Sequence, residues 1–266
     1  MTHSKPGPKL ADGRTAEVFA WGEDQVLKLY REGWPRRVVE FEHKQALASQ
    51  QTGYRVPKVG EIVEIDGRVG IVYQRVEGET MLSVFEKNML KFPGVVRQMT
   101  DLHLEMHRCE ASGLETIVQR LTDKIGRVEL LTDDERNRIL KHLRALPTDN
   151  KLLHGDFHPD NIMLTPDGPV IIDWIDATLG HPLADVARTT VLGTFGIPPE
   201  KKVERFVIHR MISGYSRRYF RLSPYSRTEL DAWLLPVAAG RLEENIPHET
   251  EPLLEYVKQL AAEMLS

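Results

Sequence analysis

Residues 152–164 read Leu-Leu-His-Gly-Asp-Phe-His-Pro-Asp-Asn-Ile-Met-Leu, and residues 169–176 read Pro-Val-Ile-Ile-Asp-Trp-Ile-Asp. Apolar residues flank the polar part on both sides, so we expect them to anchor it as a rigid loop whose carboxylates lie at the mouth of a cleft. The segment from Lys151 to Thr178 is a non-helical island in a half of the chain that otherwise shows helical patterns. This island holds most of the candidate chemistry.

Three oxygen-bearing side chains of the island have a spacing that suits phosphoryl transfer. That reaction needs a carboxylate to orient the attacking hydroxyl and oxygen ligands to hold Mg²⁺ against the nucleotide phosphates. Four residues separate Asp156 from Asn161, the spacing that kinases use between a catalytic base and a metal-binding amide. Asp173 ends an apolar, strand-like run, which would expose its carboxylate as a second metal ligand. The island therefore predicts a base and two Mg²⁺ ligands.

The first part of the chain shows strand patterns around one helix. Residues 16–21 and 25–30 are short apolar, β-branched runs separated by a turn signal, and a further strand is expected before Asp12. Residues 36–51 suit a helix. Two more strands are expected on either side of Asp66-Gly67, a dipeptide typical of a tight hairpin.

The character of the sequence changes after residue 77. We place a boundary there, with residues 1–77 as a nucleotide-binding lobe and residues 78–266 as a helical lobe that carries the loop and the acceptor site. Long helical patterns follow in this second part, at 81–89, 95–109, 133–144, 199–220, 227–242 and 249–264. The fold class is therefore α+β.

Lys28 is the candidate that the first lobe adds to the site. It stands in the strand-like run Val26-Leu27-Lys28-Leu29-Tyr30, where alternation places its side chain on the face opposite Leu27 and Leu29. A lysine on a strand can hold two phosphates as a compact charge. Alone, such a lysine is more often a solvated surface residue, and the presence of the island favours the phosphate role.

The pattern His-Gly-Asp-x-His-x-x-Asn with a downstream Ile-Asp-Trp resembles the signature of aminoglycoside and choline kinases. The resemblance covers essentially the whole chain and implies a two-lobed, protein-kinase-like fold with ATP and Mg²⁺ as cofactors. It implies that Asp156 is the catalytic base and that Asn161 and Asp173 are Mg²⁺ ligands. His154 and His158 then support the loop.

Further nucleotide contacts follow from the same resemblance. The run 42–47 is similar to the family's Glu-x-x-x-Ala-Leu helix segment, so Glu42 rather than Glu40 is expected to hold Lys28. Gln74 and Val76 fall where the family's hinge pairs its backbone with adenine, and Asp185 falls where an aspartate braces the catalytic loop.

The turn at residues 12–17 is a candidate cover for the phosphates. Its backbone amides and small residues would approach the nucleotide at Gly13, Thr15 and Ala16. The chain departs from protein kinases here, since it has one glycine rather than a Gly-x-Gly-x-x-Gly run. Together with His-Gly-Asp and Asp-Trp-Ile at the loop, this points toward small-molecule kinases.

The acceptor is expected to be a small molecule with a hydroxyl group. Acidic groups near or downstream of the loop would suit a cationic amine, an amino sugar or a choline-like compound if they converge; they are Asp160, Asp176, Glu243 and Glu244. For Glu243 and Glu244, a solvated helix end is the stronger interpretation. Nearby aromatic residues would either stack on the acceptor or fill the core; they are Trp174, Tyr215, Tyr219 and Trp233.

Other functions stay open from the sequence alone. The alternating His154, Asp156, His158 and Asp160 would suit a transition-metal site in a hydrolase. A nucleotide-binding regulator without turnover is a second alternative, and phosphorylation of protein side chains is a third. The identity of the acceptor, the choice between ATP and GTP, and the oligomeric state are not decided.

Composition excludes several classes of partner. The 39 acidic and 35 basic residues are interspersed, so no basic stripe is present to hold nucleic acid. No apolar run reaches the length of a membrane span. The single cysteine, Cys109, and the absence of a signal-like start predict a cytoplasmic protein.

Overall fold

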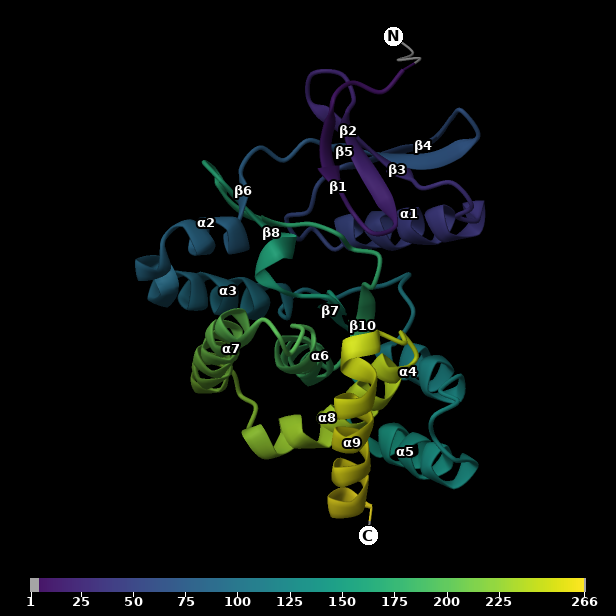
Figure 1. Ribbon diagram of the computed structural model, residues 1–266, viewed down its shortest axis with the longest axis vertical. Coiled ribbons are helices and arrows are strands. Elements are labelled where there is room, and N and C mark those ends of the chain that lie inside the picture. The colour runs from purple at the N-terminus through teal and green to yellow at the C-terminus, as the bar shows by residue number, and fades with distance from the viewer. Residues whose placement is uncertain (1–4, 266) are drawn as a thin grey trace.

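The computed structural model describes residues 5–265, apart from the side chain of Met89, and it has two lobes (Figure 1). The first lobe is a five-stranded sheet in the order β1-β2-β3-β5-β4, and all of its neighbouring strands are antiparallel. Its elements are β1 (Lys9–Asp12), β2 (Ala16–Ala20), β3 (Gln25–Tyr30), α1 (Arg36–Gln51), β4 (Val59–Ile65) and β5 (Arg68–Gln74). The predicted strand before Asp12 is confirmed as β1.

Alternation along β3 determines which side chains face the helix α1. Leu27 and Leu29 pack with Trp21 and Val72 on one side of the sheet. Tyr30 lies on the other side, in a cluster with Val39 of α1. Because side chains alternate along a strand, Lys28 shares the α1 side with Tyr30. The predicted orientation of Lys28 is confirmed.

The turn between β4 and β5 has the predicted geometry of a tight hairpin. Asp66 and Gly67 have φ values of 50° and 77°. Two successive residues at positive φ match the right-handed twist of the flanking strands, and aspartate followed by glycine is a favoured pair for such a turn.

The second lobe consists mainly of helices around one large apolar core. Its helices are α2 (Met81–Lys87), η1 (Met89–Lys91), α3 (Phe92–Met106), α4 (Ile117–Gly126), α5 (Asp133–Ala145), η2 (Pro159–Asn161), α6 (Pro182–Phe195), α7 (Lys202–Leu222), α8 (Arg227–Leu242) and α9 (Pro247–Met264). The four aromatic side chains considered for the acceptor are all buried in this core: Trp174, Tyr215, Tyr219 and Trp233. They fill the core, as the simpler of the two interpretations expected, and Trp174 also lines the cleft between the lobes.

Short strands frame the island. β7 (Lys151–Leu153) pairs with β10 (Thr178–Gly180), and β6 (Glu79–Thr80), β8 (Ile162–Thr165) and β9 (Gly168–Ile171) form a three-stranded sheet. The polar loop therefore lies between β7 and β8, and Asp173 follows β9. As predicted, apolar strands anchor the loop on both sides.

The helix α4 did not follow from the sequence. Its apolar residues Ile117, Val118, Leu121 and Ile125 have helical spacing, and Leu121 and Ile125 are buried. Thr116 caps its N-terminus by accepting a hydrogen bond from the Gln119 N–H. Of the helices within residues 5–265, none combines the length and the apolar character that a membrane span requires.

Candidate active site

Lys28 is held by a buried carboxylate of α1. Its Nζ lies 2.9 Å and 3.0 Å from the two carboxylate oxygens of Glu42, whose residue is 1% exposed. The hydroxyls of Tyr30 and Tyr73 also donate to Glu42. Glu40 instead pairs with Arg36 near the surface. Glu42 therefore has the contacts that the resemblance implied for it.

Lys28 also reaches the second lobe. Its Nζ lies 3.0 Å from Oδ1 of Asp173. Burial lowers the pKa of Lys28, but the charges of Glu42 and Asp173 outweigh it, so the pKa is raised and the amine stays charged. Asp173 adopts φ 64°, a left-handed conformation that is uncommon for residues other than glycine. A strained backbone at this point sets where its carboxylate lies.

Asp156 and Asn161 contact each other within the loop. The Asn161 Nδ2 group donates to the Asp156 backbone oxygen at 3.0 Å and to its Oδ2 at 3.3 Å. His158 Nε2 lies 3.3 Å from the same Oδ2. Burial raises the pKa of Asp156, but the hydrogen bond and charge of His158 outweigh it and hold the pKa below its usual value. Asp156 is therefore an ionised carboxylate at neutral pH.

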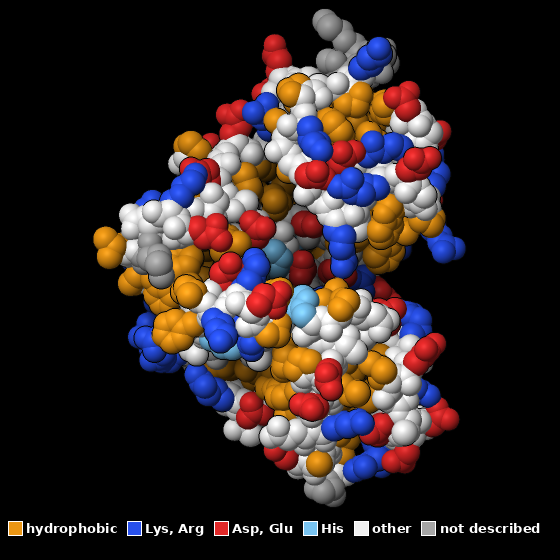
Figure 2. Space-filling model, viewed as in Figure 1, with side chains coloured by type: hydrophobic (Ala, Val, Ile, Leu, Met, Phe, Trp, Pro, Cys, Tyr) orange, Lys and Arg blue, Asp and Glu red, His pale blue; other side chains and the backbone are white. Residues whose placement is uncertain are grey.

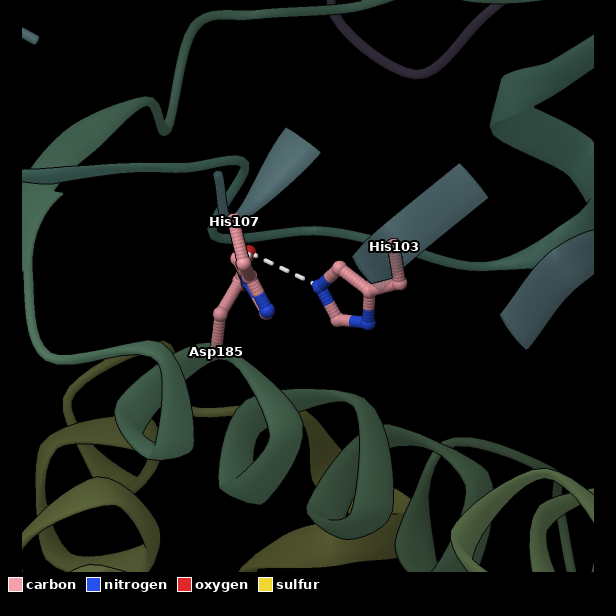
Figure 3. A group of neighbouring side chains, drawn as sticks. All are labelled: His103, His107 and Asp185. Carbon is pink, nitrogen blue, oxygen red and sulfur yellow. Dashed lines mark hydrogen bonds and ion pairs between the residues drawn. The ribbon is translucent and has the colours of Figure 1, made fainter. Parts of the chain in front are cut away.

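A buried hydrogen-bond network around Asp185 fixes the backbone of the catalytic loop. Asp185 accepts hydrogen bonds from the N–H groups of His154 at 2.7 Å and Gly155 at 2.9 Å. His103 and His107 of α3 contact the same carboxylate at 3.1 Å and 3.5 Å (Figure 3). Burial lowers the pKa of His103 to about 3, so its ring is neutral. Asp185 thus has the geometry of a brace.

The imidazole of His154 joins the two halves of the island. Its Nε2 hydrogen-bonds to the Ile172 carbonyl at 3.0 Å, and its Nδ1 accepts from the Asp156 N–H at 3.2 Å. His154 therefore connects the segment of Asp156 to the segment of Asp173. Both ring nitrogens have partners, as expected of a supporting residue.

A cleft of about 540 Å³ opens between the lobes beside Lys28 and Asp173. The space-filling view shows this hollow, with acidic side chains and a histidine gathered in it (Figure 2). Gln74 and Val76 line it. The Gln74 N–H is occupied by the Lys58 carbonyl, and within residues 5–265 the Val76 N–H has no backbone partner. Of these two residues, Val76 is therefore the one whose backbone N–H is available to a ligand in the cleft.

The predicted phosphate turn lies at the β1–β2 connection rather than on the wall of the cleft. The Gly13 N–H donates to the Ala16 carbonyl at 2.9 Å, and the Arg31 guanidinium donates to the Gly13 carbonyl. Ala16 is buried in the core of the first lobe, and Thr15 accepts from the Arg31 N–H through its carbonyl. On this hairpin the wall is formed instead by Leu10, Ala11 and Val18.

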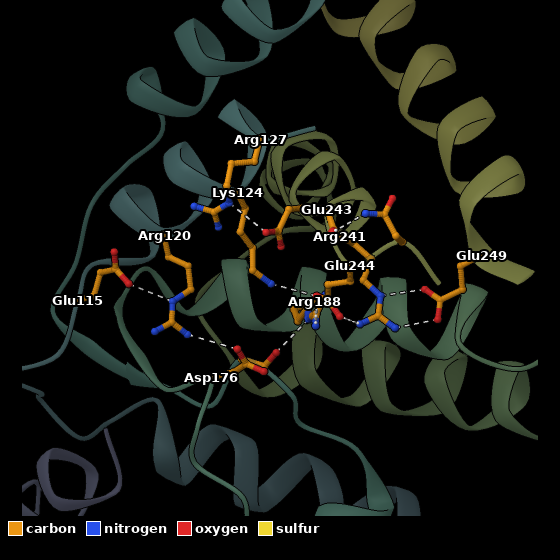
Figure 4. A network of polar contacts seen from close by, with 12 residues as sticks. Glu115, Arg120, Lys124, Arg127, Asp176, Arg188, Arg241, Glu243, Glu244 and Glu249 are labelled. Atoms are coloured by element: carbon orange, nitrogen blue, oxygen red, sulfur yellow. Dashed lines mark hydrogen bonds and ion pairs between the residues drawn. The ribbon is translucent and has the colours of Figure 1, made fainter. Parts of the chain in front are cut away.

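The four acidic residues considered for the acceptor do not form one free cluster. Glu244 binds Lys124 at 3.0 Å and Arg188 at 2.8 Å (Figure 4). Glu243 pairs with Arg127 at 3.0 Å. Asp176 lies 3.4 Å from Arg120 Nη1, and Asp160 is exposed on the loop. Glu243 and Glu244 are thus engaged by basic side chains.

Comparison with known proteins decides the family. The profile described as "Phosphotransferase enzyme family" matches residues 7–220, which is most of the chain. The chain belongs to this phosphotransferase family. The match extends from the first lobe through the loop and on to α7.

Several solved structures share the fold of this phosphotransferase. A thermostable mutant of aminoglycoside phosphotransferase APH(4)-Ia, in a ternary complex with AMP-PNP and hygromycin B, is 14% identical with a TM-score of 0.69, covering 97% of this chain and 93% of that chain. A choline/ethanolamine kinase family protein from Mesorhizobium loti is 17% identical with a TM-score of 0.62, covering 96% and 88%. Such low identities show a shared fold, and the predicted two-lobed kinase-like fold is confirmed.

One further solved structure and one curated protein are also similar to this chain. Amicoumacin kinase hAmiN, in complex with AMP-PNP, Ca²⁺ and Ami, is 16% identical with a TM-score of 0.60, covering 97% of this chain and 88% of that chain. Nonribosomal peptide synthetase nlsA from Emericella nidulans is 38% identical over 68 residues, which is 26% of this chain. The phosphotransferase spans about 1% of the length of that curated relative.

The hydrolase alternative finds no support in the geometry of the phosphotransferase. Within residues 5–265, the only group of three or more metal-type ligands that converge is His103, His107 and Asp185. The ring nitrogens of both histidines are hydrogen-bonded, to Asp185 and to the hydroxyls of Tyr215 and Tyr219. This group is a satisfied network rather than an open metal site.

Gly155 lies at a closely packed position of the catalytic loop. It has φ 79°, and a Cβ atom there would lie 2.3 Å from the Asp176 carbonyl oxygen. We expect Gly155→Ala to lower the free energy of unfolding by at least about 1–3 kcal/mol, the cost of backbone strain at one residue. Denaturant titration measures it. The control is Gly94→Ala in α3, where a Cβ meets no atom within 4 Å; equal stability of both variants would contradict this description of the loop.

Sequence reasoning missed two sets of residues in the phosphotransferase. It did not single out His103 and His107, although their spacing of four residues on one helical pattern places both rings on one face. It also missed Arg120, because α4 was not expected. Both had a usable signal, since Ile117, Val118, Leu121 and Ile125 of α4 also have helical spacing.

Proposed function

We propose that this phosphotransferase moves the γ-phosphate of ATP to a hydroxyl group of a small molecule. The observation that carries the proposal is the position of Lys28, whose Nζ lies within 3.0 Å of both Glu42 and Asp173. A strand lysine of one lobe thus meets a carboxylate from the island of the other lobe. In kinases such a lysine holds nucleotide phosphates and such an aspartate holds Mg²⁺.

The residues of the loop fit a magnesium ion. Asn161 uses its amide nitrogen for contacts to Asp156 and His158, which leaves its amide oxygen as a ligand atom. Asp173 adds a carboxylate that is 40% exposed at the cleft. Oxygen ligands of this kind suit Mg²⁺. When bound, the ion would neutralise charge on the phosphates.

In the proposed reaction the acceptor hydroxyl lies at Asp156. Its oxygen forms a bond to the γ-phosphorus while the bond from that phosphorus to the β–γ bridging oxygen breaks, and ADP leaves. The hydroxyl proton passes to the Asp156 carboxylate. Because its pKa is lowered, this carboxylate mainly orients the hydroxyl and takes the proton as the phosphoryl group is transferred.

The apolar part of the cleft suits the adenine ring. Val18, Val26 and Ala46 line it from the first lobe, and Ile172 and Trp174 line it from the second. Flat apolar walls with a few polar groups are typical of cofactor sites. The Val76 N–H is the proposed partner of an adenine nitrogen. ATP analogues are bound in the solved structures named above.

ADP release with a panel of acceptors tests the function. The panel includes aminoglycosides, choline, ethanolamine, homoserine, thioribose, macrolides and fructosamines, and product formation is followed by mass spectrometry. We expect at least one acceptor to raise ADP release above the rate without acceptor and to gain one phosphate. ATP binding without ADP release on any acceptor would favour the alternative of a nucleotide-binding regulator. Failure to bind ATP would contradict the proposal.

A further inference from the structure

A second, smaller cavity lies directly beside the catalytic loop. Its volume is about 40 Å³, and it is lined by Gly155 and Asp176 of the island together with residues of α4, α6 and α8. Gly155 directly precedes Asp156 in the chain. A cavity of this size holds a few water molecules or one small polar group. A substituent bound there would lie close to a hydroxyl held at Asp156.

Basic side chains outnumber carboxylates on the wall of this cavity. Four of them line it, namely Arg120, Lys124, Arg188 and Arg241. The carboxylates that line it are Asp176 and Asp185, and Asp185 already accepts from two loop amides and two histidines. The charged groups on this otherwise largely apolar wall are therefore mainly hydrogen-bond donors with positive charge.

The carboxylates behind this wall are occupied by the same basic groups. Glu244 contacts Lys124, Arg188 and Arg241, and Glu249 binds Arg241 through both oxygens at 2.7 Å and 2.8 Å (Figure 4). An ammonium group in the cavity would have to displace these cations from buried carboxylates. Breaking a buried pair is costly because it leaves an unpaired charge. The network therefore disfavours a cationic group there.

Donor capacity remains on Arg120 and Lys124. Arg120 donates to Glu115 at 3.1 Å through Nε and to Asp176 at 3.4 Å through Nη1. Its Nη2 is buried, and within residues 5–265 it has no hydrogen-bond partner, although the side chain is 10% exposed. The ammonium of Lys124 has three N–H groups, and it forms an ion pair with Glu244. The buried Arg120 donor without a partner favours a ligand that supplies acceptor oxygens.

Arg188 has a different task from these two residues. Its Nε donates to the Gly155 carbonyl at 2.9 Å, and its Nη2 group binds Glu244 at 2.8 Å. It therefore supports the loop. Arg120 also contacts the first lobe, since its guanidinium stands 5.5 Å from the ring centre of Phe41 on α1. A ligand held by Arg120 would therefore lie beside both the catalytic loop and the first lobe.

We propose that the acceptor carries a carboxylate group, which Arg120 and Lys124 bind while its hydroxyl lies at Asp156. This inference rests on the proposed function and names the substrate class as hydroxy acids. It replaces the expectation of a cationic amine, since Glu243 and Glu244 are engaged by basic side chains. The carboxylate takes a hydrogen bond from each of the two cations.

Two matched sets of probes test the inference. The members of each set differ at one end only: glycerate, glycerol and 3-amino-1,2-propanediol form the short set, and gluconate, sorbitol and glucamine form the long set. Binding to the protein with Mg²⁺ and AMP-PNP is measured by calorimetry, and kcat/KM by ADP release with ATP. In at least one set we expect the carboxylate to be favoured over the neutral and the cationic member by about tenfold or more, the effect of one or two charged hydrogen bonds.

Variants of α4 identify the groups responsible. Arg120→Gln and Lys124→Met are each expected to reduce the preference for the carboxylate to within about threefold of the neutral probe, since each removes a charged donor. Arg127→Gln is the matched control, because Arg127 follows the same helix, pairs with Glu243 and does not line the cavity. It should keep the full preference. Circular dichroism establishes whether each variant is folded. If Arg120→Gln does not fold, Lys124→Met provides the test.

Three results would overturn the inference. They are equal or tighter binding of the cationic probe, binding of no member of either set at millimolar concentration, and a carboxylate preference that persists in both α4 variants. Calorimetry with AMP-PNP alone reports on the nucleotide site separately. Absence of nucleotide binding would contradict the proposed function, whereas nucleotide binding without a carboxylate preference would contradict this inference alone.

Discussion

Replacement of Asp156 by asparagine is expected to lower kcat for phosphate transfer by about 10²-fold or more, the loss typical when a general base is removed. The amide keeps the size of the side chain and its place beside Asn161 and His158, where Oδ2 lies 3.3 Å from each partner nitrogen. It has no carboxylate to accept the proton of the acceptor hydroxyl. The affinity for Mg²⁺ and ATP should change little, since the ion is assigned to Asn161 and Asp173.

The measurement for Asp156→Asn combines steady-state ADP release with calorimetry of nucleotide binding. Asp167→Asn is the matched control, because Asp167 is exposed at the turn between β8 and β9 and its side chain is remote from the proposed reaction. The control should retain the wild-type rate. An Asp156→Asn enzyme that turns over as fast as the wild type would remove this residue from the mechanism.

The second large effect is expected from Asp173→Asn. The change removes a proposed ligand of Mg²⁺ and the partner that lies 3.0 Å from Lys28 Nζ. Loss of metal-ion charge stabilisation is worth several kcal/mol, so we expect kcat/KM for ATP to fall by about 10²-fold or more. Asparagine is chosen because Asp173 has φ 64°, a conformation that asparagine tolerates better than alanine does.

A dependence on metal concentration distinguishes this effect from misfolding. The Asp173→Asn enzyme should need much more Mg²⁺ for half-maximal rate, and its far-UV circular dichroism should match the wild type. Asp66→Asn is the control for the backbone, because Asp66 also has a positive φ, of 50°, at an exposed hairpin. Unchanged Mg²⁺ dependence and rate in Asp173→Asn would show that the metal lies elsewhere.

Local patterns were sufficient to predict the first lobe. Alternation along residues 26–30 predicted the face of the sheet on which Lys28 lies. The dipeptide Asp66-Gly67 predicted the hairpin between β4 and β5. Both signals depend on neighbouring residues, which the sequence displays directly. The choice of Glu42 over Glu40 needed more, because both are helix glutamates two residues apart. The resemblance to a known helix segment made that choice, and the contact at 2.9 Å agrees with it.

Contacts between distant segments were harder to predict. The basic partners of Glu244 stand in α4, α6 and α8, and nothing in the run Glu243-Glu244 indicates them. Its negative charge was therefore considered for a substrate, and the structure places it among basic side chains. The phosphate turn at Gly13 stays a prediction. Its small residues suggested a close approach to the nucleotide, and Ala16 is buried against the first-lobe core.

The central claim is that one metal-bound triphosphate is held jointly by Lys28 and the loop. A crystal structure with AMP-PNP and Mn²⁺, with the metal located by its anomalous signal, tests it most directly. We expect Mn²⁺ at about 2.1 Å from the Asn161 amide oxygen and from an Asp173 carboxylate oxygen, with Lys28 Nζ at the phosphates. Metal bound instead at His103, His107 and Asp185, or a nucleotide outside the cleft beside Lys28, would contradict the claim.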